Sequence, residues 1–312
     1  MLHSFIINPN AGKGKVQGRL VADINSYCAA HGVDYEIYVT KCAGDGTRYV
    51  RERAQQVEKV RFYAVGGDGT LYEVVNGAAG LENVEVGIIP IGSGNDFIRL
   101  FGGKGAFSQL DAQINGTPVT LDLIRCGEKF AINQCSMGFD AEVCAKQAEF
   151  KKVRFLSGET AYLASLVYCL LHKLGAVFTI KIDDDDPFTK NVLFCVGANS
   201  RWYGGGFQCA PKALPDDGKL DVVVLSNEFS RLKLFSVIFD YKKGKHLSWP
   251  ITTYRRANRV SISSEKPAAV NVDGECEYVH ESEFELVPGA IRFNIPTVST
   301  YIADRQSGRL GE

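Results

Sequence analysis

A glycine-rich turn that joins an apolar run to an amphipathic stretch is the strongest constraint on how this chain folds. A short apolar run, with Phe62, Ala64 and Val65, predicts a buried strand that stops at Gly66-Gly67-Asp68-Gly69. Beyond the turn, apolar residues recur at the spacing of one helix face: Leu71, Val74, Val75 and Ala78. The sequence therefore predicts a strand, a glycine turn and a helix in immediate succession.

This arrangement favours an anion at the start of the helix. Glycines let the backbone approach a ligand closely, and the first N–H groups of a helix have no internal partner. They lie at the positive end of the helix dipole, where a phosphate binds well. Asp68 would repel that phosphate unless a cation lay between them, which favours magnesium-linked nucleotide chemistry. An ordinary tight turn is the alternative, because glycine turns are common.

Three further loops follow predicted strands in the first part of the chain. Residues 2–7 lead into a loop at Asn8, residues 33–39 end at Thr40, and residues 86–89 lead into a second glycine loop at 90–96. The repeated strand–loop–helix order predicts an α/β domain whose parallel sheet carries helices on both faces. Ligands of such sheets bind outside the carboxyl ends of the strands. We therefore expect all four loops to converge on one nucleotide site.

The pattern changes after Leu121, where short strand-like runs joined by turns become dominant. They predict an antiparallel β-sandwich over residues 122–296, interrupted by helices near 163–174 and 230–241. The nucleotide-binding domain is then residues 1–121, and the sequence leaves open whether the tail, 297–312, returns to it. The acidic run Asp183–Asp186, followed by a proline, is interpreted as a solvated hairpin turn and not as a metal cluster.

Composition limits the classes of function. A chain of 312 residues is long for one core, which favours two domains, and a net charge of −1 gives no support for nucleic-acid binding. The nine cysteines form no C-x-x-C pair, so free thiols in a reducing compartment are expected. No segment has the layout of a signal peptide or the length of a membrane span. We expect a cytoplasmic protein that touches a membrane surface transiently; a homodimer is left open.

Five motifs in a fixed order resemble a known family. They are NPNAGKG (8–14), GGDGTLYEVVNG (66–77), PIGSGNDFIR (90–99), APKALPDDGKLDV (210–222) and NVDGE (271–275). Together they are similar to the diacylglycerol kinase catalytic family in its bacterial soluble form, a relative of sphingosine and ceramide kinases. NAD kinases and phosphofructokinases carry similar glycine turns, and the resemblance implies their fold for the first domain, but GSGNDF favours a lipid kinase. Tyr72 departs from the pattern, since the family usually has Asn there.

The resemblance implies ATP-dependent phosphorylation of a lipid hydroxyl, most simply of diacylglycerol to phosphatidic acid, in which the second domain binds the lipid. Phosphatidylglycerol or a sphingoid base is the alternative acceptor, and an NAD kinase or a non-catalytic nucleotide or lipid sensor is disfavoured. The implied ATP contacts are Asn8, Pro9, Asn10, Ala11, Gly12, Thr40, Gly67, Asp68, Gly69, Thr70, Leu71, Tyr72, Glu73, Ser93 and Asp96.

The catalytic carboxylates are likewise implied by the resemblance. Transfer to a hydroxyl needs a base within hydrogen-bond reach, and the family pattern assigns this role to Glu275, with Asp273 supporting it or the magnesium. Asp68 and Asp96 are suited to hold Mg·ATP or its water shell. Each motif has a structural alternative: Asp273-Gly274 is a strong hairpin signal, and Asp96 is placed to cap a helix.

A second, structural magnesium is implied at Asp217, together with the carbonyls of Leu214 and Lys219, although a plain type I turn is the alternative. The family pattern also places Asp122 and Asn133 near the site.

Two features bear on the lipid. Trp202, Tyr203 and Phe207 would shape an apolar opening near the acceptor. Three basic clusters would meet an anionic membrane, or form only solvated surface: Lys151-Lys152-Arg154, Lys242-Lys243-Lys245 and Arg255-Arg256.

Overall fold

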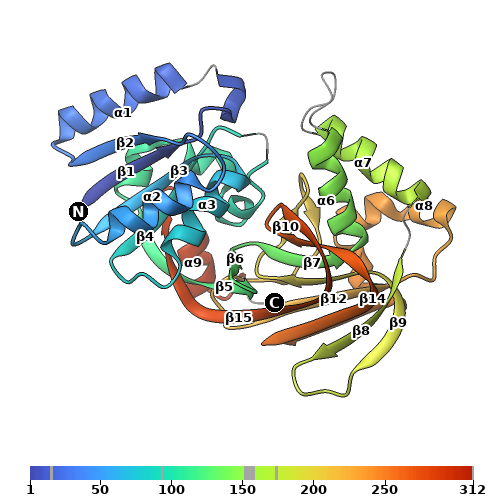
Figure 1. Ribbon diagram of the computed structural model, residues 1–312. Coiled ribbons are helices and arrows are strands. Elements are labelled where there is room, and N and C mark those ends of the chain that lie inside the picture. The colour runs from blue at the N-terminus through green and yellow to red at the C-terminus, as the bar shows by residue number, and fades with distance from the viewer. Residues whose placement is uncertain (15–16, 93, 151–158, 173–174, 311–312) are drawn as a thin grey trace. The chain divides into compact units, whose positions relative to one another are not determined.

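The chain folds into two compact units in a computed structural model that describes residues 1–14, 17–92, 94–150, 159–172 and 175–310 (Figure 1). Unit 1 is Met1–Asp122 together with Pro288–Glu312, and unit 2 is Leu123–Val287. No helix in the described ranges is long and apolar enough to cross a lipid bilayer.

Unit 1 is built on a parallel sheet with the order β15-β4-β3-β1-β2. Its strands are β1 (Leu2–Ile7), β2 (Tyr35–Val39), β3 (Val60–Gly66), β4 (Val84–Pro90) and the end of β15 (Glu275–Ile295). Every residue of β1, β3 and β4 is buried, as expected where helices cover both faces of a parallel sheet.

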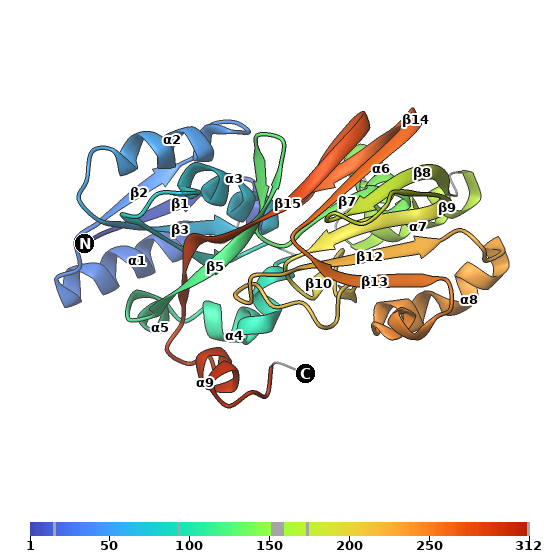
Figure 2. The ribbon, with the colours of Figure 1, turned by 90° about the horizontal axis from the view of Figure 1, so that it is seen from below.

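The helices of unit 1 lie on both faces of this sheet. Helix α1 (Gln17–His31) covers one face, and α2 (Asp45–Ala54) and α3 (Asp68–Ala78) cover the other (Figure 1, Figure 2). Ile24 and Cys28 of α1 pack against Phe5, Tyr63 and Val65 of the sheet. The short helices that follow β4 are η2 (Phe97–Phe101), α4 (Gly103–Phe107) and α5 (Leu110–Ile114).

The C-terminal segment completes unit 1. Phe293 of β15 pairs in parallel with Val86 of β4, and its ring makes an edge contact with Phe97. Tyr301, in α9 (Tyr301–Gln306), packs against Phe101. The structure therefore places the return to the first domain at Pro288, before the boundary at residue 296 that we expected. The sequence pattern of residues 290–295 predicts a strand, but such a pattern is the same whichever sheet the strand joins. It therefore did not show that this strand pairs with β4.

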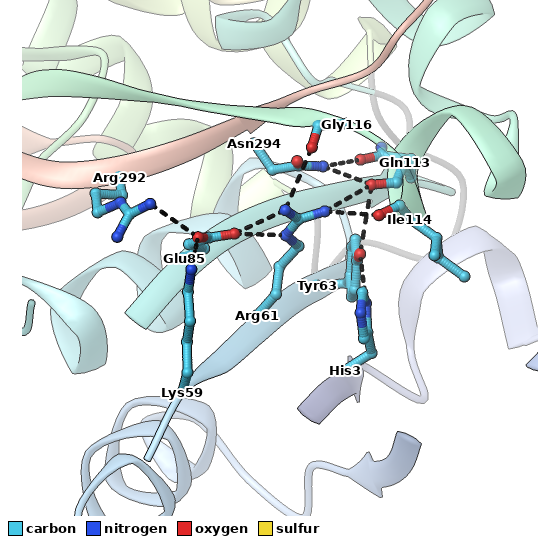
Figure 3. Close-up of polar contacts among 10 residues, drawn as sticks. All are labelled: His3, Lys59, Arg61, Tyr63, Glu85, Gln113, Ile114, Gly116, Arg292 and Asn294. Atoms are coloured by element: carbon cyan, nitrogen blue, oxygen red, sulfur yellow. Dashed lines mark hydrogen bonds and ion pairs between the residues drawn. The ribbon is translucent and has the colours of Figure 1, made fainter. Parts of the chain in front are cut away.

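A buried ion network ties this segment to the amino-terminal ends of the strands (Figure 3). The Arg61 guanidinium donates to Glu85 Oε2 at 2.7 Å and to the carbonyl oxygens of Gln113 and Ile114. Arg292 and Lys59 pair with the other oxygen of Glu85, at 3.0 and 3.1 Å. Because both Arg61 and Glu85 are fully buried, removal of either partner would leave an uncompensated charge in the core.

Unit 2 is built on an antiparallel sheet with the order β13-β12-β9-β7-β14-β15, and β8 pairs with both β9 and β14. Its further strands are β5 (Thr117–Cys126), β6 (Lys129–Ala131), β7 (Gln134–Gly138), β8 (Ala176–Ile182), β9 (Phe188–Ala198), β10 (Trp202–Tyr203), β11 (Phe207–Gln208), β12 (Leu220–Ser226), β13 (Thr252–Ala257) and β14 (Arg259–Val272). Its helices are α6 (Phe139–Phe150), α7 (Glu159–His172), α8 (Arg231–Lys242) and the 3₁₀ helix η3 (Lys245–Ser248).

Two features of unit 2 bear on the sequence analysis. The acidic run after β8 is a turn, in which Asp183 has φ 48° and its carboxylate accepts the backbone N–H groups of Asn258 and Arg259. No group of three or more His, Cys, Asp or Glu residues in the described ranges is placed to hold a metal. Helix α6 was not expected, because its stretch has little apolar periodicity.

Candidate active site

Two glycine loops of unit 1 meet at the carboxyl ends of β3 and β4. The backbone N–H groups of Ile91 and Gly92 both donate to the carbonyl oxygen of Gly66, at 2.9 and 3.0 Å. A Cβ atom on Gly92 would lie 2.7 Å from the Cα atom of Gly67. The loops therefore pack backbone against backbone, and a glycine is required at position 92.

Asp68 joins these two loops. It is the first residue of α3, and its carboxylate accepts the backbone N–H groups of Asn95 at 2.7 Å and Asp96 at 3.1 Å. A Cβ atom on Gly94 would lie 2.3 Å from the same carboxylate, so the approach also depends on that glycine. Burial, together with the negative charge of Asp96, raises the pKa of Asp68 to about 6. A cation at this position would relieve the repulsion.

Asp96 is buried and forms an ion pair with Arg99 at 2.7 Å. It occupies the N-cap position of η2, but its side chain makes no capping hydrogen bond. Lys104 of α4 donates to the carbonyl oxygen of Gly92 at 2.7 Å, which adds a positive charge beside the glycine loop. Sequence reasoning missed Lys104, because a single lysine several residues beyond a motif carries no signal of its own.

The loop after β1 reaches the start of α3. Asn8 Nδ2 donates to Thr70 Oγ1 at 3.3 Å, and Asn8 Oδ1 accepts the N–H of Asn10 at 2.9 Å. Gly12 has φ 63°, in the left-handed region that glycine favours. Thr40, at the end of β2, is held by a backbone hydrogen bond to Ile7 at the end of β1. The structure thus gathers these expected ATP contacts at one edge of the sheet.

Other residues that we expected to contact ATP have structural roles. The Leu71 side chain lies in the core. The Glu73 carboxylate accepts the N–H groups of Gly44 at 3.0 Å and Gly46 at 2.8 Å, and so satisfies the start of α2. Pro9, Ala11 and Tyr72 are half-buried, whereas Asn10 and Gly69 are exposed. Ser93 lies outside the described residues.

The NVDGE motif of unit 2 forms the two-residue turn between β14 and β15. Asp273 has φ 48° and Gly274 has φ 106°, the two positive values that a type I′ turn requires. The Asp273 carboxylate accepts three successive backbone N–H groups, from Ile132 at 2.7 Å, Asn133 at 3.1 Å and Gln134 at 2.8 Å. Asp273 therefore anchors the loop between β6 and β7.

Glu275, the residue after this turn, is exposed. Its carboxylate makes no hydrogen bond or ion pair with another described residue, so it is accessible from solvent. The two carboxylates of the motif thus differ: that of Asp273 is engaged by the backbone, and that of Glu275 is open to a ligand.

The two residues that the family pattern places near the site make buried polar contacts. In unit 1, Asp122 Oδ1 accepts the N–H of Gly289 at 2.8 Å. In unit 2, Asn133 Nδ2 donates to the carbonyl oxygen of Trp202 at 2.9 Å. Asn133 Oδ1 is buried and has no hydrogen-bond partner among the described residues.

The turn at Asp217 has donor atoms that suit magnesium. Asp217 Oδ1 accepts the N–H of Lys219 at 3.0 Å, and Oδ2 forms an ion pair with Arg256. The pairing with Arg256 shows that a positive charge is favoured at this carboxylate. Carbonyl and carboxylate oxygens are the ligands that magnesium prefers, so the residue set fits the ion, with Arg256 competing for the same oxygen.

An apolar pocket lies in unit 2 between the sheet and helices α6, α7 and α8. Its empty volume is about 550 Å³, counting its opening to solvent. Two of the three aromatic residues expected to shape an apolar opening, Tyr203 and Phe207, line it. The hydroxyl groups of Tyr203 and Tyr241 form a hydrogen bond of 2.8 Å in its wall.

One carboxyl group also lines this pocket. Asp140, in the first turn of α6, is buried, and no described residue makes a hydrogen bond of normal geometry to its carboxylate. Burial raises the pKa of Asp140 to about 6, against the opposing effect of Ser136 and the amide groups at the start of α6. The pocket lining is therefore largely apolar and includes one carboxyl group.

Two family models match this chain. The diacylglycerol kinase catalytic domain matches residues 3–126, and the YegS C-terminal NAD kinase beta sandwich-like domain matches residues 133–295. The diacylglycerol kinase of Bacillus subtilis (strain 168) is 29% identical over 90% of this chain and 91% of its own length. A protein of Stenotrophomonas maltophilia (strain K279a), described as "Probable lipid kinase YegS-like", is 31% identical over 88% of this chain and 91% of its own length.

Solved structures share the fold. A diacylglycerol kinase from Bacillus anthracis str. Sterne superposes with a TM-score of 0.66 and 21% identity, over 95% of this chain and 97% of that one. An NAD kinase from Archaeoglobus fulgidus, solved in complex with ATP, superposes with a TM-score of 0.50 and 11% identity, over 99% of this chain and 98% of that one. The glycine loops, the two matching family models and the similarity over most of the chain lead to one conclusion: this protein belongs to the diacylglycerol kinase family of lipid kinases.

Proposed function

We propose that this protein transfers the γ-phosphoryl group of ATP to a lipid hydroxyl, most simply converting diacylglycerol to phosphatidic acid. The observation that carries the proposal is the contact of the two glycine loops, joined by Asp68, in a chain of the lipid kinase family. Gly67 is half-buried and Gly69 is exposed at the start of α3, where an anion is favoured.

The ATP phosphates would lie against the backbone of Gly67 and Gly69, with the Asn8 loop beside them. Asp68 and Asp96 would hold the catalytic Mg²⁺ or its water shell, because the negative charge of Asp96 acts on the Asp68 carboxylate and a cation between them would relieve the repulsion. Bound Mg²⁺ would supply neutralisation of the phosphate charge. Lys104, through its hydrogen bond to Gly92, adds fixed positive charge at the same loop.

Glu275 would accept the proton of the acceptor hydroxyl. Its exposed carboxylate is suited to this role, while Asp273 would act as a positioning residue that fixes the turn through three backbone hydrogen bonds. Asp217, with the carbonyl oxygens of Leu214 and Lys219, would hold a second Mg²⁺ with a structural role.

The acceptor would place an apolar chain in the pocket of unit 2. A pocket lined largely by apolar and aromatic side chains suits an acyl chain better than a polar nucleotide. Phosphatidylglycerol and sphingoid bases share this chemistry and are the alternative acceptors. We also propose that the protein works in the cytoplasm at the membrane surface, where such lipids are found.

Purified protein incubated with Mg²⁺, γ-labelled ATP and separate acceptors tests this function. We expect label in the product formed from diacylglycerol, and less from phosphatidylglycerol or a sphingoid base. Label in NAD with none in any lipid would contradict the proposal, and so would the absence of transfer to every acceptor. Glu275→Gln is the matched control, because it removes a proton acceptor at an exposed position.

A further inference from the structure

The outer sides of helices α7 and α8 expose an unusual amount of apolar surface. The described residues expose eleven large apolar side chains, and six of them lie on these two helices: Leu163, Val167, Leu171, Leu232, Phe235 and Phe239. We call these six residues the outer face. Leu232 is 83% exposed and Phe239 is 73% exposed, values at which a water-facing helix normally carries polar residues.

The spacing of these residues makes two stripes. On α7 they recur at every fourth residue, and on α8 they recur at three and then four residues, so each set lies on one side of its helix. Other side chains of the same helices line the apolar pocket, namely Leu166 and Leu170 of α7 and Leu234 and Ile238 of α8. The Arg231 guanidinium donates to the carbonyl oxygen of Leu171 and joins the two helices. The two helices therefore carry both part of the pocket lining and the outer face.

Positive charge accompanies this surface. Residues 231–245 contain Arg231, Lys233, Lys242, Lys243 and Lys245 but only one acid, Asp240, so five positive charges and one negative charge give a net charge of +4. The whole chain has a net charge of −1, so the charge of this segment is local. A helix with large apolar residues and flanking lysines has the composition of one that lies in the interface of an anionic bilayer.

A second copy of this chain fits the outer face less well. A symmetric dimer would bring two segments of charge +4 together, and like charges repel. A bilayer containing anionic lipids supplies both the opposite charge and the apolar layer.

We propose that the outer face of α7 and α8 is the surface by which this protein docks on an anionic lipid bilayer, with Leu232 and Phe239 inserted below the headgroups. The inference rests on the proposed function, because a lipid acceptor must leave the bilayer to enter the pocket that these helices cover. Docking itself requires neither ATP nor phosphoryl transfer, so it is testable separately.

Sedimentation with vesicles tests docking. On vesicles of equal parts phosphatidylglycerol and phosphatidylcholine, the double variant Leu232→Gln/Phe239→Gln should bind at least about tenfold more weakly than the wild type. Lys243→Gln should weaken binding to these vesicles about fivefold. The difference from the wild type should disappear on vesicles of pure phosphatidylcholine or at high salt. Val298→Gln, which changes an exposed apolar residue of unit 1, is the matched control and should bind like the wild type. Unchanged binding of the double variant would overturn the proposal.

Two further measurements separate the outcomes. Light scattering reports the oligomeric state, and a change from dimer to monomer in the double variant would make the outer face an interface between copies, which overturns bilayer docking. Kinase activity on a short-chain, detergent-dispersed diacylglycerol should be the same in the double variant and the wild type, while activity on vesicles should fall. A wild type that phosphorylates no acceptor but docks through Leu232 and Phe239 would refute the proposed function and leave the docking surface standing.

Discussion

The carboxylate of Asp68 accepts the backbone N–H of Asn95 at 2.7 Å. The residue that the sequence marks as a magnesium ligand is thus also a link between the loop after β3 and the loop after β4. Asn95 has φ 69°, in the left-handed region that asparagine adopts more readily than other non-glycine residues. A ligand that engages Asp68, as we propose for Mg·ATP, would therefore also act on the conformation of the second loop.

The two facing glycines should respond differently to substitution. A Cβ atom on Gly67 would meet Gly92 at 3.5 Å, an ordinary contact, whereas a Cβ atom on Gly92 would lie 2.7 Å from the Gly67 backbone. Gly92→Ala should lower the free energy of unfolding by about 1–3 kcal/mol, since backbone atoms must shift. Gly67→Ala should keep its stability, and Gly67→Val should lose ATP affinity while remaining folded. Calorimetric titration with Mg·ATP and thermal unfolding of the three variants check this; normal ATP affinity in Gly67→Val would contradict the nucleotide placement.

The two carboxylates of the NVDGE turn should separate into a catalytic and a positioning residue. Glu275→Gln should reduce turnover by about 10²–10⁴-fold, with the smaller value expected if phosphoryl transfer is largely dissociative. Its melting temperature should not change, because the wild-type side chain is exposed and unpaired among the described residues. Steady-state kinetics and thermal unfolding measure the two effects. Wild-type turnover in Glu275→Gln would show that the base lies elsewhere.

Asp273→Asn should instead lose stability. An amide group at this position would turn its NH₂ toward backbone N–H groups that the carboxylate now accepts, and unsatisfied buried donors cost about 1–3 kcal/mol. The free energy of unfolding, measured by urea denaturation, should fall, whereas the maximal rate of the folded fraction should fall less than in Glu275→Gln. Equal stability of Asp273→Asn and the wild type would be inconsistent with its anchoring role.

The magnesium proposed at Asp217 predicts a ligand-dependent stability. Added Mg²⁺ should raise the melting temperature of the wild type, and a chelator should lower it to the value of Asp217→Ala, because a ligand that binds only the folded state stabilises it. The variant itself should not respond to either addition. A melting curve that is the same with Mg²⁺ and with chelator would leave only the turn and its ion pair with Arg256.

The buried carboxyl group of the apolar pocket predicts a pH dependence. The pKa of Asp140 is 3.8 in the unfolded chain, its ordinary value, and about 6 in the folded protein. Between these two pH values the folded state therefore binds more protons than the unfolded state. The free energy of unfolding should therefore fall as pH rises from about 4 to about 6, by at most about 3 kcal/mol from this group. Asp140→Asn should match the wild type near pH 4 and exceed its stability near pH 7. If the difference in stability between Asp140→Asn and the wild type does not change with pH, Asp140 does not hold a proton in the folded state.

Local features of this protein were predictable from its sequence, because short-range physical constraints set them. The apolar runs that became β1, β3 and β4 each end in a loop rich in glycine or amide residues, and the structure gathers those loops at one edge of unit 1. Ser230, at the start of the predicted helix near residues 230–241, accepts the N–H of Lys233 and caps α8. In each case the residues that determine the local structure are close together in the chain.

Interactions between distant residues were not predictable in this way. Arg61 and Glu85 each interrupt a buried strand pattern, and nothing in the sequence shows that they pair with one another. Glu73 belongs to the glycine motif, yet its carboxylate accepts backbone N–H groups at the start of α2, a helix that precedes it in the chain. Asp273 is a strong turn signal, but its bonds to residues 132–134 depend on the pairing of β14 with β7. Such roles follow from tertiary contacts that a single sequence does not contain.

The path of β15 has a consequence for synthesis of the protein on the ribosome. Unit 2 is one continuous stretch, Leu123–Val287, whereas unit 1 needs residues 288–312 to supply Phe293 beside Val86 and Arg292 beside Glu85. Domains of a nascent chain commonly fold in the order in which they emerge. Here the amino-terminal unit is translated first but lacks a strand and a charge partner until residues 288–312 have been made. Unit 1 can therefore complete its fold only after all of unit 2 has been synthesised.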